Sequence, residues 1–212
     1  MSMNAAELAI LESQFITEST AEVLMNMRTG PSPRQVAQAL RAVGIDFVLV
    51  GAQAIGVYTG RPRATIDVDI VCHEPHRAAK ALAEQFPELT IQDRGVLVRL
   101  ILDGREAVDI IDPRKNTFYQ QVFDHCIELS QLKIKIPDLE MALASKYAAM
   151  VSPNRGMAEK KIDAADFIRV VRNNQKVNRE KIRGLVCELH ERAGEEILKF
   201  IDDVQAGKDL VI

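Results

Sequence analysis

Two aspartates one residue apart, Asp67 and Asp69, stand within the otherwise apolar stretch TGRPRATIDVDIVC, residues 59–72. Burying two like charges on one face is costly unless a positive charge lies between them. Carboxylate oxygens are ligands that Mg²⁺ prefers, and two carboxylates on one strand can converge on divalent cations. The pair therefore indicates a metal site or, if this end of the strand faces water, two solvated charges.

The stretch is expected to form a strand over residues 64–72, in which alternate side chains share one face. Thr65 would then lie on the face of the two aspartates. The alternate apolar residues, Ile66, Val68 and Ile70, would point the other way, into the core.

Two nearby features favour phosphate chemistry. VLVGA predicts a strand that runs into Gly51 and then a short helix, and this arrangement presents backbone N–H groups to a phosphate. Arg61 and Arg63 precede the aspartates, where guanidinium groups can hold polyphosphate oxygens.

A third acid, Asp109, lies between apolar neighbours in the second strand of a predicted hairpin. One more inward carboxylate on a neighbouring strand would complete a three-acid metal cradle. Asp112 is the competing candidate, but it faces the opposite side from Asp109 and precedes a proline. We therefore interpret Asp112 as a turn or cap residue.

The rest of the chain supplies the elements that would position these residues. Ser32 to Gln35 has the pattern of a helix N-cap with a proline and a capping-box glutamine. Hydrophobic periodicity and turn residues indicate the other boundaries. In chain order we expect one or two helices over 4–27, a helix from 33 to about 44, a strand over 46–50, a short helix or turn over 52–59, the aspartate strand over 64–72, a helix over 75–86, a hairpin of 95–102 and 105–111, a helix beginning at Pro137, a helix over 158–174, and a third helix or a broken pair over 178–205.

This order predicts an α/β (α+β) fold, with a mixed sheet flanked by helices and a C-terminal helical bundle. We expect an N-terminal helical extension (1–30), an α/β domain (31–130) and a helical domain (131–212). Too few Pro and Gly residues separate the last two domains to form a flexible linker, so these domains should pack together.

The composition excludes several classes of protein. The 212 residues are 47% hydrophobic with a net charge of −3, so no whole-protein field favours nucleic acid or a membrane surface. Three widely spaced cysteines without a CxxC pair indicate neither a disulfide framework nor a zinc site. The chain has no apolar run near the roughly 18 residues of a membrane span, and its start lacks a basic signal region. A cytoplasmic location with no membrane partner is expected.

Taken together, the apolar strand, the glycine, the short helix, GRPRATIDVDI and the later VDI resemble the nucleotidyltransferase fold superfamily, the polymerase-beta-like group. Within it, the pattern GxxAIxxYxGRPRxTxDxD resembles the minimal bacterial nucleotidyltransferases of the AbiEii type, the toxin halves of some toxin–antitoxin pairs. The resemblance covers roughly residues 45 to 173.

The resemblance implies an enzyme that moves a nucleoside monophosphate from a nucleoside triphosphate, ATP among the candidates, to an acceptor. Mg²⁺ or Mn²⁺, as two ions, would be bound by Asp67, Asp69 and Asp109, and Asp109 would also help to activate the acceptor hydroxyl. The family usually has Gly-Gly or Gly-Ser where this chain has Gly51-Ala52, so a hydroxyl contact is missing while backbone donation survives. The nucleotide-binding residues implied are Gly51, Ala52, Arg61, Arg63, Thr65 and Lys146.

In the helical half, the resemblance is to a pattern of a lysine-bearing helix, a loop arginine and a Lys…Asp-x-x-Asp helix. Lys146 is either a cation aimed at the nucleotide or a surface lysine with a buried stem. Asp163 and Asp166 either support the residues that contact the nucleotide or acceptor, or form ordinary ion pairs on the helix surface. The positions that match are Lys146, Arg155, Lys160 or Lys161, Asp163 and Asp166.

The acceptor stays open among an RNA end, a protein and a small molecule. Residues 155–183 hold nine Lys or Arg against four Asp or Glu, which is either a solvated face or a surface for a polyanion such as tRNA. The resemblance also implies an antitoxin partner. Two other hypotheses stay open: a non-catalytic nucleotide-binding relative or inactive toxin–antitoxin partner, and a metal-dependent phosphatase.

Overall fold

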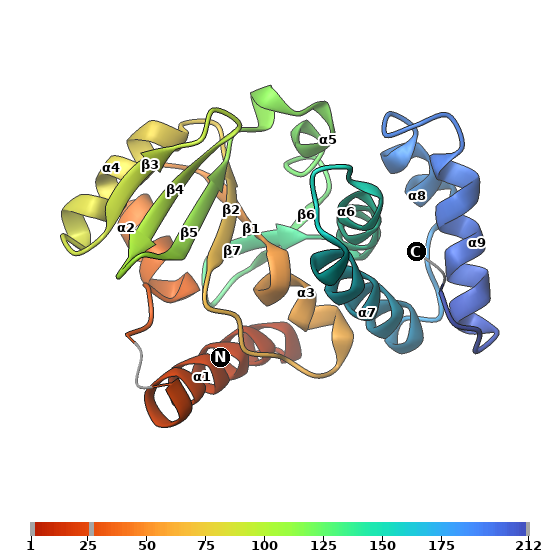
Figure 1. Cartoon of the computed structure of the whole chain (residues 1–212), viewed down its shortest axis with the longest axis horizontal. Helices are drawn as coiled ribbons and strands as arrows, with labels where there is room; N and C mark the ends of the chain where they lie inside the picture. Colours follow the sequence, from red (N-terminus) through yellow and green to blue (C-terminus); the bar gives the residue numbers. More distant parts are fainter. Residues whose placement is uncertain (1–2, 26–27, 211–212) are drawn as a thin grey trace.

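A seven-stranded mixed sheet in the order β3-β4-β5-β2-β1-β7-β6 lies between helices in the computed structural model, which describes residues 3–25 and 28–210 (Figure 1). The strands are β1 (Phe47–Val50), β2 (Val68–Cys72), β3 (Thr90–Asp93), β4 (Leu97–Leu102), β5 (Arg105–Ile111), β6 (Cys126–Leu129) and β7 (Ile134–Pro137). The helices are α1 (Ala5–Met25), α2 (Pro33–Ala42), α3 (Gly51–Thr59), α4 (Pro75–Gln85), the 3-10 turn η1 (Pro113–Lys115), α5 (Thr117–Gln120), α6 (Leu139–Val151), α7 (Met157–Asn173), α8 (Arg179–Val186) and α9 (Ala193–Gln205). The predicted fold class, a mixed sheet with flanking helices and a C-terminal bundle, is confirmed.

Each face of the central strands belongs to a different core. Val68 and Ile70 of β2 pack, as expected, in the core that α2 and α4 cover. Val48 and Val71 point the other way, into a core formed mainly by α6 to α9. Figure 1 shows α2 and α4 on the side of the sheet away from α6 and α7. Because the second core contains both strand and bundle residues, the two halves of the chain pack together.

Local sequence signals place several elements as expected. The hairpin β4–β5 turns at Asp103 (φ 50°) and Gly104 (φ 77°), the left-handed pair that a two-residue hairpin turn favours. Helix α2 begins with the predicted capping box, in which the Ser32 hydroxyl accepts from the Gln35 N–H while the Gln35 side chain accepts from the Ser32 N–H. The region 178–205 is a broken pair, α8 and α9.

Three strands were not predicted. All residues of β3 are exposed, so this strand lacks the alternation that would reveal it. Strands β6 and β7 form a hairpin in a stretch expected to be irregular, and β7 pairs with β1, so the sheet extends beyond residue 130. The expected helix start at Pro137 was wrong. Pro137 ends β7, and Asp138 caps α6 by accepting from the Met141 N–H at 3.1 Å.

The aspartate strand is shorter than expected. It begins at Val68, and the register of β2 with β1 and β5 starts at Asp69 and Val68 respectively, so the residues before it have no strand partner. Segment 61–67 is therefore an irregular connection, and Ile66, expected in the core, is 46% exposed. Asp67 lies in this connection and Asp69 in the strand.

The N-terminal segment forms one long helix, α1, that packs against the body as predicted. Ile10 is buried in the first core, whereas Leu8 and Phe15 are 52% and 70% exposed, so the expected apolar stripe is only partly covered. The end of the predicted region, residues 26 and 27, lies outside the described residues. Of the helices in 3–25 and 28–210, each is too short or too polar to cross a membrane.

The capping box of α2 gives a stability prediction. Ser32→Ala removes the acceptor for the Gln35 N–H and should lower the free energy of unfolding by about 1 kcal/mol. Urea denaturation followed by circular dichroism measures this change. Ser130→Ala, at an exposed position, is the control and should change stability little. An equal loss in both variants would contradict the capping role.

Candidate active site

Four adjacent strands bring the central site residues into one row across the sheet. Val50 pairs with Asp69 in β1–β2, which places Gly51 beside Asp69. Asp69 pairs with Asp109 in β2–β5, and Asp109 pairs with Arg99 in β4–β5. Residues in register lie on the same face of a sheet, about 4.8 Å from one strand to the next. The row therefore joins a helix N-terminus, two carboxylates and a guanidinium.

Gly51 permits a close approach that no other residue would allow. Its φ of 68° lies in the left-handed region, and a Cβ at this position would collide with the Asp69 carboxylate. Helix α3 starts at Gly51, and its N-cap Val50 makes no side-chain cap hydrogen bond. The N–H groups of the first turn, with Gly51 and Ala52 at its start, have no acceptor within the helix, which is the arrangement that binds anions.

The ionisation of Asp69 depends on its surroundings. Burial, together with the negative charges of Asp67 and Asp109, raises the pKa of Asp69 to about 7, although Lys146 and Arg155 act in the opposite direction. An additional cation beside the carboxylate would lower that pKa again. Asp69 is therefore a carboxylate that needs a positive partner to be fully charged at neutral pH.

Asp109 lies beside Asp69, but it already has a cationic partner. Arg99 donates from Nε and Nη2 to the two carboxylate oxygens of Asp109 at 2.7 and 2.6 Å, a bidentate pair, and it also contacts Glu106. The competing candidate, Asp112, accepts from the Arg114 N–H and caps η1, which confirms its prediction as a cap residue.

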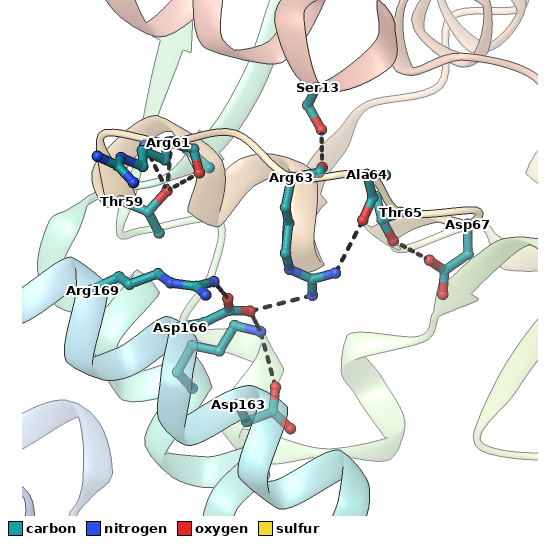
Figure 2. Close-up of polar contacts among 12 residues, drawn as sticks. Ser13, Thr59, Arg61, Arg63, Ala64, Thr65, Asp67, Asp163, Asp166 and Arg169 are labelled. Carbon is teal, nitrogen blue, oxygen red and sulfur yellow. Dashed lines mark hydrogen bonds and ion pairs between the residues drawn. The ribbon is translucent and has the colours of Figure 1, made fainter. Parts of the chain in front are cut away.

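Asp67 is held by its own connection. The Thr65 hydroxyl donates to Asp67 Oδ1 at 2.6 Å, as Figure 2 shows. Thr65, expected among the nucleotide-binding residues, therefore contacts the first aspartate directly.

The residues fit a hard divalent cation in donor type and in charge. Asp67 and Asp69 offer carboxylate oxygens, and Mg²⁺ is commonly held by one or two carboxylates together with substrate phosphates. Within residues 3–25 and 28–210, however, no three His, Cys, Asp or Glu side chains are placed to hold a metal ion together. Asp109 is paired with Arg99, and the three-acid cradle expected from the sequence stays a prediction.

Opposite the acids lies a buried ionic cluster centred on Lys146 of α6. Its ammonium group contacts Asp163 Oδ1 at 2.9 Å and Asp166 Oδ2 at 2.8 Å, and all three side chains are buried. Burial alone would raise the pKa of Asp166, but the attraction of Lys146 and Arg63 outweighs it and lowers that pKa. Lys146 is therefore a buried cation rather than a surface lysine.

Arginines from three segments complete this cluster. Arg155 contacts Asp163 at 2.9 Å. Arg63 and Arg169 contact Asp166 at 3.3 and 3.5 Å (Figure 2). Four cations against the two aspartates, 4 − 2, give the cluster a formal charge of +2. Lys146 and Arg155 of this cluster line the same cavity as Asp69, so part of the positive charge faces the acidic row.

The remaining predicted cations lie outside the cluster. Arg61 is exposed, and in Figure 2 its side chain points away from Arg63 and Asp166. Lys161 is exposed on α7, so the structure does not bring it to Asp163 and Asp166. Of the two arginines before the aspartates, only Arg63 reaches the cluster.

A cavity of about 80 Å³ lies between the acidic row and the cluster, with Gly51, Asp69, Lys146 and Arg155 in its wall. A second cavity of about 460 Å³ shares Tyr119, Ala149 and Arg155 with it. Burial and the negative charge of Asp69 raise the pKa of the Tyr119 phenol, which therefore stays protonated. The small cavity suits a few phosphate-sized groups, and the larger one offers further room next to it.

Sequence reasoning missed Arg99 and Tyr119. The alternation of β4 marks Arg99 as a polar residue between apolar ones, but a regular two-residue hairpin would set it opposite Val108. An irregularity in the pairing after Leu100 moves it opposite Asp109 instead. Tyr119 lies in a stretch expected to be irregular and carries no motif.

The chain matches no protein-family model and no curated protein sequence. Solved structures resemble it at low sequence identity. The Megavirus polyadenylate synthase has a TM-score of 0.50 and 13% identity over 79% of this chain and 36% of the viral chain. The antibiotic-resistance factor ANT(2'')-Ia has a TM-score of 0.49 and 13% identity over 77% of this chain and 91% of its own. A nucleotidyltransferase-like antigen from Paracoccidioides brasiliensis has a TM-score of 0.48 and 18% identity over 80% of this chain and 89% of its own.

These identities concern the fold alone. The likeness to the viral synthase supports a shared fold, and the matched region is about a third of that enzyme's chain.

The raised pKa of Asp69 gives a pH-dependent prediction. Its folded-state pKa of about 7 exceeds the unfolded value of about 3.9, so ionisation of Asp69 lowers stability as the pH rises between these values. Without added metal, Asp69→Asn should be more stable than the wild type by on the order of 2 kcal/mol at pH 8, and the gain should shrink towards pH 4. Urea denaturation at several pH values measures it. Asp124→Asn, at an exposed position, is the control, and a gain independent of pH would contradict the assignment.

The buried ionic cluster gives a second prediction. Lys146→Met leaves two buried carboxylates with fewer cations and should cost about 3 kcal/mol of stability. Lys199→Met, which breaks an exposed pair with Asp203, should cost under about 0.5 kcal/mol. Equal losses in thermal or urea denaturation would show that the cluster contributes no more than a surface pair.

Proposed function

We propose that the protein is a metal-dependent nucleotidyltransferase that moves a nucleoside monophosphate from a nucleoside triphosphate to an acceptor. The observation that carries this proposal is the meeting of three groups around one cavity. These are the uncapped N-terminus of α3 at Gly51, the carboxylate of Asp69, and the cations Lys146 and Arg155. The fold shared with a polyadenylate synthase supports the same class of reaction.

In this proposal the protein mainly binds and orients the triphosphate. The first N–H groups of α3, at Gly51 and Ala52, donate to phosphate oxygens. Lys146 and Arg155 supply positive charge from the opposite wall of the cavity, where burial strengthens the attraction. The neighbouring cavity has room for the remainder of the nucleotide or for the acceptor.

The carboxylates would hold Mg²⁺ or Mn²⁺, as one or two ions, through Asp67 and Asp69. When bound, such a cation neutralises charge on the phosphoryl oxygens. Asp109 is the residue proposed to take the proton of the acceptor hydroxyl and to complete the metal site. For either role the hydrogen bonds from Arg99 to the Asp109 carboxylate must break.

Surface charge supports a polyanionic acceptor such as tRNA. Several basic residues of 155–183 are paired: Arg179 with Asp202, and Lys181 with Asp138. Lys161 and Arg172, by contrast, are exposed on α7. An RNA end is therefore the acceptor class we favour, and an AbiEii-like toxin with an antitoxin partner is the biological setting that the sequence resemblance suggests.

One observation favours a second function. The bidentate Arg99–Asp109 pair neutralises the acid that the transfer reaction would need. A protein in which this pair never opens would bind nucleotide without transferring it. Non-catalytic nucleotide binding is therefore the alternative.

Incubation with each labelled nucleoside triphosphate, ATP included, Mg²⁺ or Mn²⁺ and total tRNA tests the main proposal. The wild type should attach label to an acceptor, and Asp67→Asn/Asp69→Asn should reduce transfer by 100-fold or more, as expected when transition-state charge stabilisation of about 3 kcal/mol is lost. Asp124→Asn, exposed and far from the row in sequence, is the matched control and should keep full activity.

The outcomes separate the hypotheses. Label transfer that persists in the double variant would contradict the proposed mechanism. Metal-dependent nucleotide binding without transfer, to tRNA or to any component of a cell extract, would favour the non-catalytic function. Release of phosphate with no labelled acceptor would indicate a phosphatase.

A further inference from the structure

We propose that helix α1 is a positioning element for the reaction, acting through the hydroxyl groups of Ser13 and Thr17 on the connection that carries Arg63 and Asp67. The proposal rests on the proposed function, because it assigns a role in binding the nucleotide and its metal.

Two hydroxyls of α1 hold this connection directly. The Ser13 hydroxyl, which is buried, donates to the Arg63 carbonyl at 2.7 Å (Figure 2). The Thr17 hydroxyl donates to the Ser13 carbonyl at 2.8 Å and accepts from the Thr65 N–H at 3.1 Å. Both contacts join residues about fifty positions apart in the sequence, so they set the place of the connection relative to α1.

The connection needs such support because the sheet does not provide it. Strand pairing of β2 begins only at Val68, so the backbone groups of Arg63 and Thr65 have no partners in the sheet. The hydrogen bonds from α1 replace that missing pairing at alternate residues. The connection is only partly buried, and side chains of a distant helix supply partners for two of its backbone groups.

From the supported residues, contacts lead directly to the site. Arg63 extends to Asp166 of the ionic cluster, and Thr65 donates to Asp67. Asp67 and Asp69 are only two residues apart, so their carboxylates repel each other when both are charged. Without an external hold, this repulsion favours movement of Asp67 away from the site.

Helix α1 is itself anchored at its other end. Glu7, which is buried, accepts from the Gln131 N–H in the turn between β6 and β7 at 2.6 Å. The helix thus spans from the far hairpin of the sheet to the aspartate connection. A rigid helix fixed in this way can hold the connection in place when a charged ligand arrives.

The test compares Thr17→Val, which keeps the shape of the side chain but removes the hydroxyl, with Thr17→Ser, which restores it. Thr20→Val is the matched control, because Thr20 lies on the same helix and makes no side-chain contact to the connection among the hydrogen bonds found in residues 3–25 and 28–210. Ser13→Ala is a second, independent variant. Two quantities are measured: amide hydrogen exchange of Thr65, and binding of Mn²⁺ together with each of ATP, GTP, CTP and UTP.

Loss of one hydrogen bond should raise the exchange rate of the Thr65 amide and weaken Mn²⁺–nucleotide binding, each by roughly 3- to 10-fold, in Thr17→Val. Thr17→Ser should recover most of both effects, Ser13→Ala should weaken binding similarly, and Thr20→Val should change neither. Unchanged circular dichroism and melting within a few degrees would separate this result from general unfolding.

Two results would overturn the proposal in different ways. Faster exchange at Thr65 with unchanged Mn²⁺–nucleotide binding would make α1 a support for the connection with no role at the site. If the wild type bound no nucleotide with Mn²⁺, the proposed function itself would be wrong, and the positioning role would fall with it. If Thr17→Val did not fold, Ser13→Ala would decide by its effect on Mn²⁺–nucleotide binding, with Thr20→Val as the control.

Discussion

The site depends on one constraint: two carboxylates stand side by side on neighbouring strands. The register of β2 with β5 sets Asp69 beside Asp109, about one strand spacing apart. Asp109 is buried and Asp69 is partly buried. Such a pair is stable only with positive charge nearby. Arg99 supplies it on the side of Asp109, and Lys146 supplies it across the cavity from Asp69. Strand β4 and the helical bundle therefore place positive charges on two sides of the carboxylate pair.

The ionic cluster around Lys146 also links the two halves of the protein. It joins α6 to α7 through Asp163 and Asp166, and Asp166 in turn binds Arg63 from the connection before β2. Because breaking a buried ion pair leaves an uncompensated charge, separating the bundle from the sheet would be costly. The same charges that stabilise the packing therefore fix the distance between Lys146 and the carboxylates of the acidic row.

Local patterns predicted much of this arrangement, and long-range geometry accounts for the rest. Gly51, the aspartate pair and the hairpin turn follow from turn chemistry and alternation. The pairing of Asp109 with Arg99 could not be predicted in this way. One irregularity in the pairing of β4 and β5 places Arg99 opposite Asp109, and the hydrophobic pattern of the sequence does not reveal such a one-residue shift. The start of β2 at Val68 depends on how far the neighbouring strands extend, and the hydrogen bond from the Thr65 N–H to the Thr17 hydroxyl joins segments distant in the sequence. Both are tertiary facts.

The three acids, alike in the sequence, are chemically different in the fold. Asp109 is neutralised by a guanidinium, Asp67 is held by a hydroxyl, and Asp69 retains a raised pKa near 7. Asp69 is thus the acid whose charge depends most on what occupies the cavity. A cation that binds it must displace a proton below pH 7, so cation affinity at Asp69 should increase as the pH rises towards that value. The charge of Asp69 therefore depends on whether a cation is bound beside it. Lys146 and Arg155 already lower the pKa of Asp69, so they limit how much a bound cation can change its charge.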